Sequence, residues 1–336
     1  MELLLVDQDA PDPDAIARAA AQLRNGRLVA FPTETVYGLG ANALDPSAVA
    51  RIYRAKGRPS NNPLIVHVAD VAGARRIVAE WPRIAEQLAA RWWPGPLTIV
   101  LEKNASIPNS VTAGLTKVGV RVPAHPVALA LLRAAGVPIA APSANRANAV
   151  SPTTAQHVQN SLPDADVLVL DGGRCEVGIE STVLDLSGPV PTMLRPGGVS
   201  QAEIEHELGM PIRRVEASDD GDAGRPAPGM SKKHYAPRAK LVRIPHGDVG
   251  AMARAIDDAR RAGELVAALA IGESVCAAAA PAACVAMPDD PHGYARWLYA
   301  ELHAMDDRGM TRIVVEDVPP GTAWDGVRDR LARASA

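Results

Sequence analysis

Residues 56–68, KGRPSNNPLIVHV, join two different kinds of predicted element. The preceding residues 45–57, DPSAVARIYRAKG, predict a helix with Pro46 in its first turn. Residues 63–68, PLIVHV, predict a short buried strand, because apolar β-branched residues follow a polar turn flanked by prolines. A helix and a strand in direct succession indicate an α/β protein.

Other runs along the first part of the chain have the same strand character, with Pro or Gly at their ends. These runs are residues 27–33, 96–102, 118–123, 137–143 and 166–171. Further helices are predicted to begin at Ser151 and Ser200, since serine is a favoured N-cap residue. The connections are long and mixed, which favours a twisted, partly open sheet over a regular βαβ repeat.

The composition changes near residue 211 and predicts a division into domains. We expect one domain over residues 1–210 and a linker over residues 211–239 that is rich in Gly, Pro, Asp and Ala. Residues 240–336 alternate between strand and helix patterns. They predict a smaller, Rossmann-like α/β domain with parallel strands.

Composition excludes several classes of protein. The chain has 336 residues, is 47% hydrophobic and carries a net charge of −3. No apolar run approaches the roughly 20 residues of a membrane span, and the start does not resemble a signal peptide, so a cytoplasmic protein is expected. The three cysteines, an odd number without zinc-ligand spacing, are expected to be unpaired thiols.

Positive charge is nevertheless concentrated in segments without acids. Residues 103–163 contain five Lys or Arg and no Asp or Glu, and residues 46–69 and 231–240 are also free of acids. If these segments meet in space, they form a pocket with a positive field that suits a polyphosphate or a carboxylate. Taken alone, Lys56 and Arg58 fit a solvated helix end better than a binding site, because cations there are favoured by the helix dipole.

Small polar loops follow several predicted strands, where α/β proteins commonly bind ligands. The loops are FPTETVYGLG (31–40), APSANRANAVSPTT (141–154), GIEST (178–182) and LRPGG (194–198). Neither a Walker A loop nor a G-x-G-x-x-G fingerprint is present, and no G-x-S-x-G elbow indicates a serine hydrolase. A lone strand histidine such as His67 is ordinarily a core residue.

Taken together and in order, these motifs resemble the YrdC-like family. The K-x-R and S-x-N signatures of that family match Lys56/Arg58 and Ser143/Asn145. The segment PAPGMSKKHYAP (226–237), followed by a second α/β domain, is similar to the longer branch of two-domain threonylcarbamoyl-AMP synthases. The resemblance implies a twisted YrdC-type sheet around a positive cavity.

The resemblance also implies a reaction. L-threonine, bicarbonate and ATP would give L-threonylcarbamoyladenylate and pyrophosphate, and a downstream complex would transfer the threonylcarbamoyl group to tRNA. Mg²⁺ would accompany ATP, with no metal site made by the protein. The alternatives are a double-stranded RNA-binding module without catalysis, a related carbamoyl-adenylate enzyme, and a generic adenylate-forming ligase. Direct RNA contact remains open, and no membrane partner is expected.

Site residues follow from matching positions in the family motifs. Catalytic roles are implied for Lys56, Arg58, Ser143 and Asn145. L-threonine would contact Thr35, His67, Arg121, Ser143 and Ser181, with Arg121 on its carboxylate. ATP would contact Arg58, Asn62, Lys117, Ala141, Ser151, Arg195 and Tyr235.

Two of these assignments carry a specific question. The family has a threonine four residues before the pocket arginine, whereas this chain has Lys117 there and Thr116 one residue earlier. Tyr235 lies in the basic part of the linker and is expected to act as a lid over the nucleotide, unless it packs on the surface of a simple tether.

Overall fold

The helix and strand predicted around residues 56–68 are both present in the computed structural model, which describes residues 1–215, 233–272, 276 and 284–336. Helix α2 (Pro46–Lys56) begins after Asp45, whose carboxylate accepts the N–H of Ser47. It ends at Gly57, which has a φ of 59° and so supplies the left-handed turn that stops the helix. Strand β4 (Ile65–His67) follows.

The chain forms two compact units. Unit 1 comprises residues 1–147 and 151–230, and unit 2 comprises residues 148–150 and 231–336. Most of the predicted linker, residues 216–232, lies outside the described residues.

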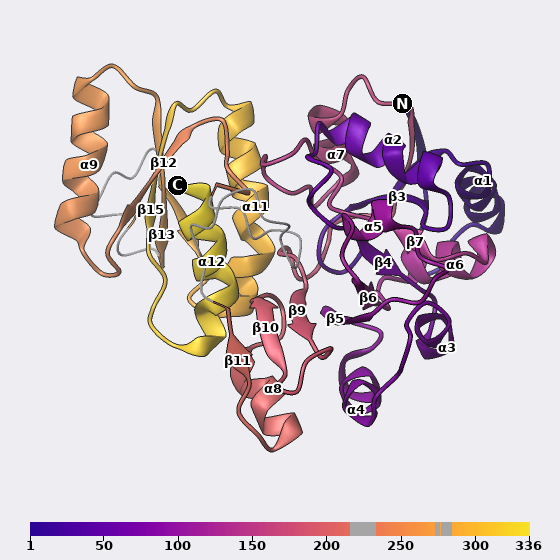
Figure 1. Cartoon of the computed structure of the whole chain (residues 1–336). Coiled ribbons are helices and arrows are strands. Elements are labelled where there is room, and N and C mark those ends of the chain that lie inside the picture. The colour runs from indigo at the N-terminus through magenta and orange to yellow at the C-terminus, as the bar shows by residue number, and fades with distance from the viewer. Residues whose placement is uncertain (216–232, 273–275, 277–283) are drawn as a thin grey trace. The chain divides into compact units, whose positions relative to one another are not determined.

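Within its described residues, unit 1 contains one eleven-stranded mixed sheet, in the order β1-β8-β2-β3-β7-β4-β6-β5-β9-β10-β11 (Figure 1). The other strands are β1 (Glu2–Leu5), β2 (Leu28–Phe31), β3 (Gly38–Asn42), β5 (Leu97–Glu102), β6 (Lys117–Arg121), β7 (Ile139–Ala140), β8 (Val167–Asp171), β9 (Thr182–Asp185), β10 (Thr192–Arg195) and β11 (Arg213–Arg214). The expected mixed α/β sheet is confirmed, although β1, β3 and β11 were not predicted as strands and β11 lies within the predicted linker.

Unit 1 contains two large apolar cores and a small third cluster of Ile65, Val100, Val183 and Leu194, and side-chain alternation along the strands separates the two large ones. On β2, Val29 and Phe31 pack with α1 (Pro13–Arg24) and α6 (Pro126–Ala135). Leu28 and Ala30 point to the other face and pack in the larger core. The larger core includes side chains from α2, α3 (Val71–Arg75), α4 (Arg83–Trp92), α5 (Asn109–Thr112), α7 (Ala155–Ser161) and α8 (Gln201–Leu208).

The two predicted serine caps had different outcomes. Ser200 begins α8 with a capping box, in which its hydroxyl accepts the N–H of Glu203 and the Glu203 carboxylate accepts the N–H of Ser200. The prediction for Ser151 is wrong, because α7 is capped by Thr154. Ser151 is fully buried and makes a different contact, described below.

Unit 2 confirms the predicted small parallel domain. Its described strands, β12 (Lys240–Ile244), β13 (Val266–Ile271), β14 (Cys284–Met287) and β15 (Arg312–Glu316), are parallel in the order β12-β15-β13-β14. Its long helices are α9 (Val249–Arg261), α11 (Pro291–Asp307) and α12 (Asp325–Ala334). The short helix η1 (Thr322–Trp324) precedes α12.

The expectation of three unpaired thiols is wrong for two cysteines. Cys276 and Cys284 form a disulfide, with their Cα atoms 5.2 Å apart, inside the range that such a bond spans. Cys175 alone is free, and it is buried in unit 1. An odd cysteine count with no metal spacing could not identify which two residues the fold brings together.

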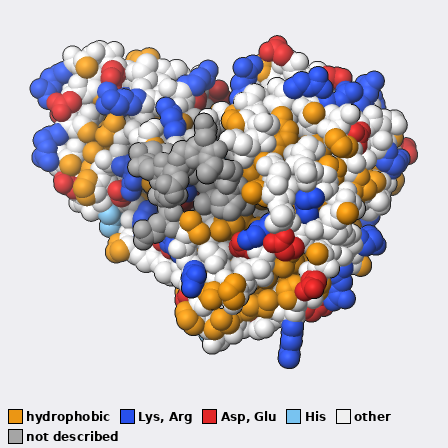
Figure 2. Space-filling model, viewed as in Figure 1, with side chains coloured by type: hydrophobic (Ala, Val, Ile, Leu, Met, Phe, Trp, Pro, Cys, Tyr) orange, Lys and Arg blue, Asp and Glu red, His pale blue; other side chains and the backbone are white. Residues whose placement is uncertain are grey.

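The surface is mixed in charge. On the face drawn in Figure 2, Lys and Arg side chains are interspersed with Asp and Glu, and apolar side chains gather near α8 and β11. In the part of the chain that the structure describes, no helix is long and apolar enough to cross a membrane.

Gly40 tests how tightly the sheet of unit 1 is packed. A Cβ atom at this position would lie 2.8 Å from Ile139 and 2.8 Å from Phe31, so Gly40→Ala should lower the free energy of unfolding by roughly 1–3 kcal/mol. Urea unfolding followed by tryptophan fluorescence measures this. Gly188→Ala is the matched control, since nothing lies within 4 Å of its added Cβ. Equal midpoints for the two variants would contradict the packing described here.

Candidate active site

A buried ion pair joins the loop after β2 to the end of β6. The Glu34 Oε1 atom lies 2.7 Å from an Arg121 terminal nitrogen, Nη2, and both side chains are less than a tenth exposed. The other carboxylate oxygen of Glu34 accepts the N–H of Ala124 at 3.0 Å. The Arg121 Nε donates to the carbonyl of Gly95 at 3.1 Å. Arg121, expected to bind a carboxylate, thus already has one from the protein.

The sheet places His67 beside Arg121. The two residues are register partners on the parallel strands β4 and β6. Their neighbours Val66 and Val120 point into the larger core, so His67 and Arg121 occupy the opposite face. Burial, together with the positive charge of Arg121, lowers the pKa of His67 to about 3, so the imidazole is neutral at ordinary pH. Its Nδ1 is buried and makes no hydrogen bond.

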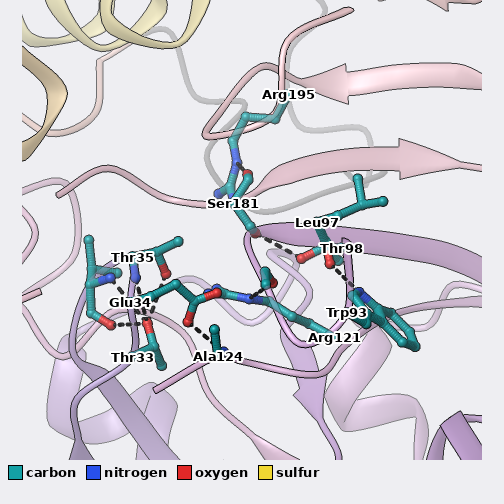
Figure 3. A network of polar contacts seen from close by, with 12 residues as sticks. Thr33, Glu34, Thr35, Trp93, Leu97, Thr98, Arg121, Ala124, Ser181 and Arg195 are labelled. Carbon is teal, nitrogen blue, oxygen red and sulfur yellow. Dashed lines mark hydrogen bonds and ion pairs between the residues drawn. The ribbon is translucent and has the colours of Figure 1, made fainter. Parts of the chain in front are cut away.

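Hydroxyl groups lie next to this pair. Thr35 is fully buried and shares a 2.8 Å hydrogen bond with the hydroxyl of Thr33. Ser181 and Thr98 share another of 2.8 Å, and the carbonyl of Ser181 accepts the Arg195 guanidinium at 2.9 Å. Figure 3 shows Glu34, Arg121, Ser181 and Arg195 in one network. Four predicted L-threonine residues and one predicted ATP residue therefore share a region of unit 1.

Close backbone approach fixes Ser181 in this network. A Cβ atom on Gly197 would lie 2.4 Å from the backbone of residues 180–182. Only glycine allows the LRPGG loop to lie this near the GIEST loop. These two motifs therefore hold each other in place.

A second group centres on Lys56, at the end of α2. Its ammonium is buried and donates to the carbonyl of Ser143 at 2.5 Å and to the carbonyl and side-chain oxygens of Asn145. Burial, with the nearby Arg58, lowers the pKa of Lys56 well below its usual value. The K-x-R and S-x-N motifs are thus brought together, with the lysine holding the loop that carries Ser143 and Asn145.

Two neighbours of Lys56 complete this group. The Arg58 guanidinium donates to the carbonyls of Asn62 and Pro63 at 3.2 and 2.9 Å, which shapes the turn before β4. The Asn62 Oδ1 atom is buried without a hydrogen-bond partner. The N–H of Ala141 is bonded to the carbonyl of Ile65, so any ligand contact from this backbone would use another group.

Glu180 is related to both groups, by its charge and by its place in the chain. It accepts a 2.5 Å hydrogen bond from the hydroxyl of Ser151, and its charge acts on Lys56. The next residue, Ser181, belongs to the Arg121 group. This corrects the expectation of an acid-poor pocket, because the site contains two buried carboxylates, Glu34 and Glu180.

One predicted ATP contact, Lys117, lies at the opposite end of β6 from Arg121. Lys117 starts β6, four residues before Arg121, and its ammonium is 3.0 Å from the Asp185 carboxylate. The carbonyl of Thr116 accepts the N–H of Lys103, and the choice between Thr116 and Lys117 stays open.

Tyr235 belongs to unit 2. It has a φ of 59°, lies below the Arg330 guanidinium at 5.0 Å and contacts the ring of Tyr299. The N–H of the next residue, Ala236, donates to the carbonyl of Asn148, which lies in the middle of the 141–154 loop. A left-handed backbone at a residue other than glycine is commonly found at functional sites.

Sequence reasoning missed Glu34, Thr98 and Glu180. Glu34 and Glu180 stand inside quoted motifs, but nothing local indicated which cations they meet. Thr98 is a polar residue within an apolar strand pattern, PLTIVLE, and this break in the pattern was the available signal.

The chemistry available to this site is electrostatic. Within the described residues, no group of three or more His, Cys, Asp or Glu side chains could hold a metal ion. Buried Arg and Lys with short hydroxyl side chains suit a substrate with a carboxylate and a second with phosphates.

A separate cavity of 480 Å³ lies in unit 1 between α3 and the end of α6. Its lining includes Arg76, Arg133 and Pro138 and none of the predicted site residues. It is therefore distinct from the groups described above.

Comparisons with known proteins show the family of the chain. Residues 21–197 match a family model of the Sua5, YciO and YrdC proteins, described as "Telomere recombination". Residues 199–336 match the "Threonylcarbamoyl-AMP synthase, C-terminal domain". A threonylcarbamoyl-AMP synthase of Bacillus subtilis is 40% identical, covering 98% of this chain and 96% of its own.

Full-length structures are also similar. A crystal structure of Pyrococcus abyssi Sua5 complexed with L-threonine superposes with a TM-score of 0.92 at 40% identity, covering 100% of this chain and 98% of that one. Escherichia coli YciO, at 23% identity and a TM-score of 0.54, shares the fold over 61% of this chain. The chain therefore belongs to the two-domain, Sua5-type family of threonylcarbamoyl-AMP synthases.

Proposed function

We propose that this threonylcarbamoyl-AMP synthase condenses L-threonine, bicarbonate and ATP into L-threonylcarbamoyladenylate, with release of pyrophosphate. The observation that carries the proposal is the buried pair of Arg121 and His67 on one face of the sheet. The buried contact between Ser181 and Arg195, and the charge of Glu180 that acts on Lys56, add to it. A relative of similar length and fold has been solved with L-threonine.

The proposed reaction requires fixed positive charge and a site that excludes water. The amine of threonine adds to bicarbonate with loss of water, and an oxygen of the resulting carbamate attacks the α-phosphorus of ATP. Both reactants are anionic, so fixed cations lower their repulsion. Carbamates lose CO₂ in water, and a site made of buried side chains slows that loss.

For L-threonine, we assign the carboxylate to Arg121 and the remaining polar contacts to Thr35, His67, Ser143 and Ser181. Neutral His67 can accept a hydrogen bond through its unpartnered Nδ1, for example from the ammonium or hydroxyl of threonine. Ser181 is hydrogen-bonded to Thr98 on β5, the strand next to the β6 strand that carries Arg121, as Figure 3 shows for the hydrogen bond.

For ATP, we assign contacts to Arg58, Asn62, Lys117, Ala141, Ser151, Arg195 and Tyr235. Lys56 and Asn145 hold the Ser143 loop, and the Lys56 charge adds to the field on the phosphates. Mg²⁺ would be bound mainly by phosphate oxygens and water, since the two carboxylates of the site are already engaged by protein donors.

The product has a further fate in this proposal. A threonylcarbamoyl-transfer complex would use it for N6-threonylcarbamoyladenosine in tRNA. The RNA-binding alternative gains no support from the surface, where basic side chains alternate with acidic ones on the face drawn in Figure 2.

The reaction itself gives the first test. With ATP and bicarbonate, pyrophosphate release should depend on L-threonine, and L-serine should give a lower kcat/KM because it lacks the methyl group. A pyrophosphate-release assay with threonine, serine and no amino acid measures this. Release that is independent of the amino acid would contradict the assignment, and salt-sensitive RNA binding without turnover would favour the alternative.

The neutral state of His67 predicts a pH dependence of stability. With a pKa near 6.5 unfolded and about 3 folded, only the unfolded state gains this proton between those values. The stability that neutral His67 contributes is therefore complete above pH 6.5, and the free energy of unfolding is lower by about 2 kcal/mol at pH 5. In His67→Gln, the free energy of unfolding should change less between pH 6.5 and pH 5 than it does in the wild type. Parallel pH profiles would show that folded His67 titrates normally.

Substitution of Tyr235 tests its proposed role as a lid over the nucleotide. Tyr235→Ala should lower kcat and raise the KM for ATP, because the nucleotide loses an aromatic contact and its protection from water. Tyr235→Phe keeps the ring and removes the hydroxyl, so it distinguishes the contribution of the ring from that of the hydroxyl. Steady-state kinetics with both variants, after a check of folding by circular dichroism, measures this. Full activity of Tyr235→Ala would leave the segment as a simple tether.

A further inference from the structure

Glu34 is one of the two buried carboxylates of the site that the assigned reaction does not use. Its Oε1 atom is 2.7 Å from Arg121 Nη2, and its Oε2 atom accepts the N–H of Ala124. The exposed fractions of the two side chains are 8% for Glu34 and 5% for Arg121. A carboxylate this close to the arginine that should meet the substrate carboxylate competes with it, so its presence calls for a reason.

The loop that carries Glu34 is held rigidly. The hydroxyl of Thr33 accepts the N–H groups of Thr35 and Val36 and donates to the Val36 carbonyl at 2.6 Å. The Glu34 carbonyl accepts the N–H of Val177 at 2.7 Å. Because the backbone is fixed on both sides, the carboxylate has a set position and is not a surface acid that happens to reach Arg121.

Arg121 is held along two of its three nitrogens. Nε donates to the Gly95 carbonyl, and Nη2 faces Glu34. In the described part of the chain, no acceptor is bonded to Nη1. The Nη2–Oε1 contact is an ion pair by distance and lacks hydrogen-bond geometry. Glu34 therefore leaves Nη1 for a ligand and cancels the net charge of the pair.

We propose that Glu34 is a positioning residue that neutralises and orients Arg121, so that this end of the site accepts a zwitterionic amino acid and rejects inorganic anions. The inference rests on the proposed function, in which Arg121 meets the threonine carboxylate. A neutral pair offers a negative and a positive end to the ammonium and carboxylate of a zwitterion. A free arginine would equally attract phosphate, which accompanies ATP in every cell.

The rest of the site is positively charged, which is why a neutral end for the amino acid would matter. Lys56 and Arg195 are buried cations of the same unit, and they serve the nucleotide in the assignment above. Glu34 thus divides a positive site into a cationic end for phosphates and a neutral end for the amino acid.

The test uses inorganic phosphate as the probe and calorimetry as the readout, without ATP. For the wild type, the Kd of L-threonine should be unchanged by phosphate. In Glu34→Gln, L-threonine should bind about tenfold more weakly, as expected for loss of a charged partner. Phosphate should now compete with it. Glu102→Gln is the matched control, because Glu102 is an exposed carboxylate on β5, and it should behave as the wild type.

The outcomes separate this inference from the proposed function. Failure of the wild type to bind L-threonine would contradict the proposed function, and phosphate binding to Glu34→Gln would still be measured directly. If the wild type binds L-threonine and Glu34→Gln is indistinguishable from it, the inference is wrong. Should Glu34→Gln fail to fold, Glu34→Asp keeps the charge with a shorter reach. It should bind L-threonine more weakly and remain insensitive to phosphate, and unchanged threonine affinity would overturn the inference.

Discussion

The structure of unit 1 depends on giving each of its buried basic side chains a carboxylate or carbonyl partner. Lys56, Arg121 and Arg195 are each at most 4% exposed, and an unpaired buried cation of this kind costs roughly 3–5 kcal/mol. Glu34 meets Arg121, the carbonyl of Ser181 meets Arg195, and the carbonyls of Ser143 and Asn145 meet Lys56. Each partner comes from a polar loop at a strand end, so the fold and the site are specified by the same motifs.

Much of the fold could be predicted because it follows from local patterns. The helix ending at Lys56 has an Asp45 cap, a proline in its first turn and a glycine at its end, and all three signals are local. Strand β3 escaped notice because GLGAN has two glycines and few β-branched residues. It is a strand because Gly40 lets Phe31 and Ile139 pack against its backbone, which is a tertiary effect.

The site shows the same division. Cations and hydroxyls could be selected from motifs, and the structure brings Arg121, Ser181 and Arg195 together as expected for one site. Their counter-charges could not be selected, because Glu34 and Arg121 are 87 residues apart in the chain and meet only when β2 and β6 join the same sheet. An absence of acids along a segment therefore says little about the charge of the site it enters, since other segments supply the carboxylates.

The most direct measurement is a crystal structure of this chain with L-threonine and a non-hydrolysable ATP analogue. The account predicts that the threonine carboxylate lies within about 3 Å of Arg121 Nη1 while Glu34 keeps its contact with Nη2. It also predicts that the phosphates lie toward Lys56 and Arg195. A threonine carboxylate bound to any other cation, with Arg121 still closed on Glu34, would contradict it.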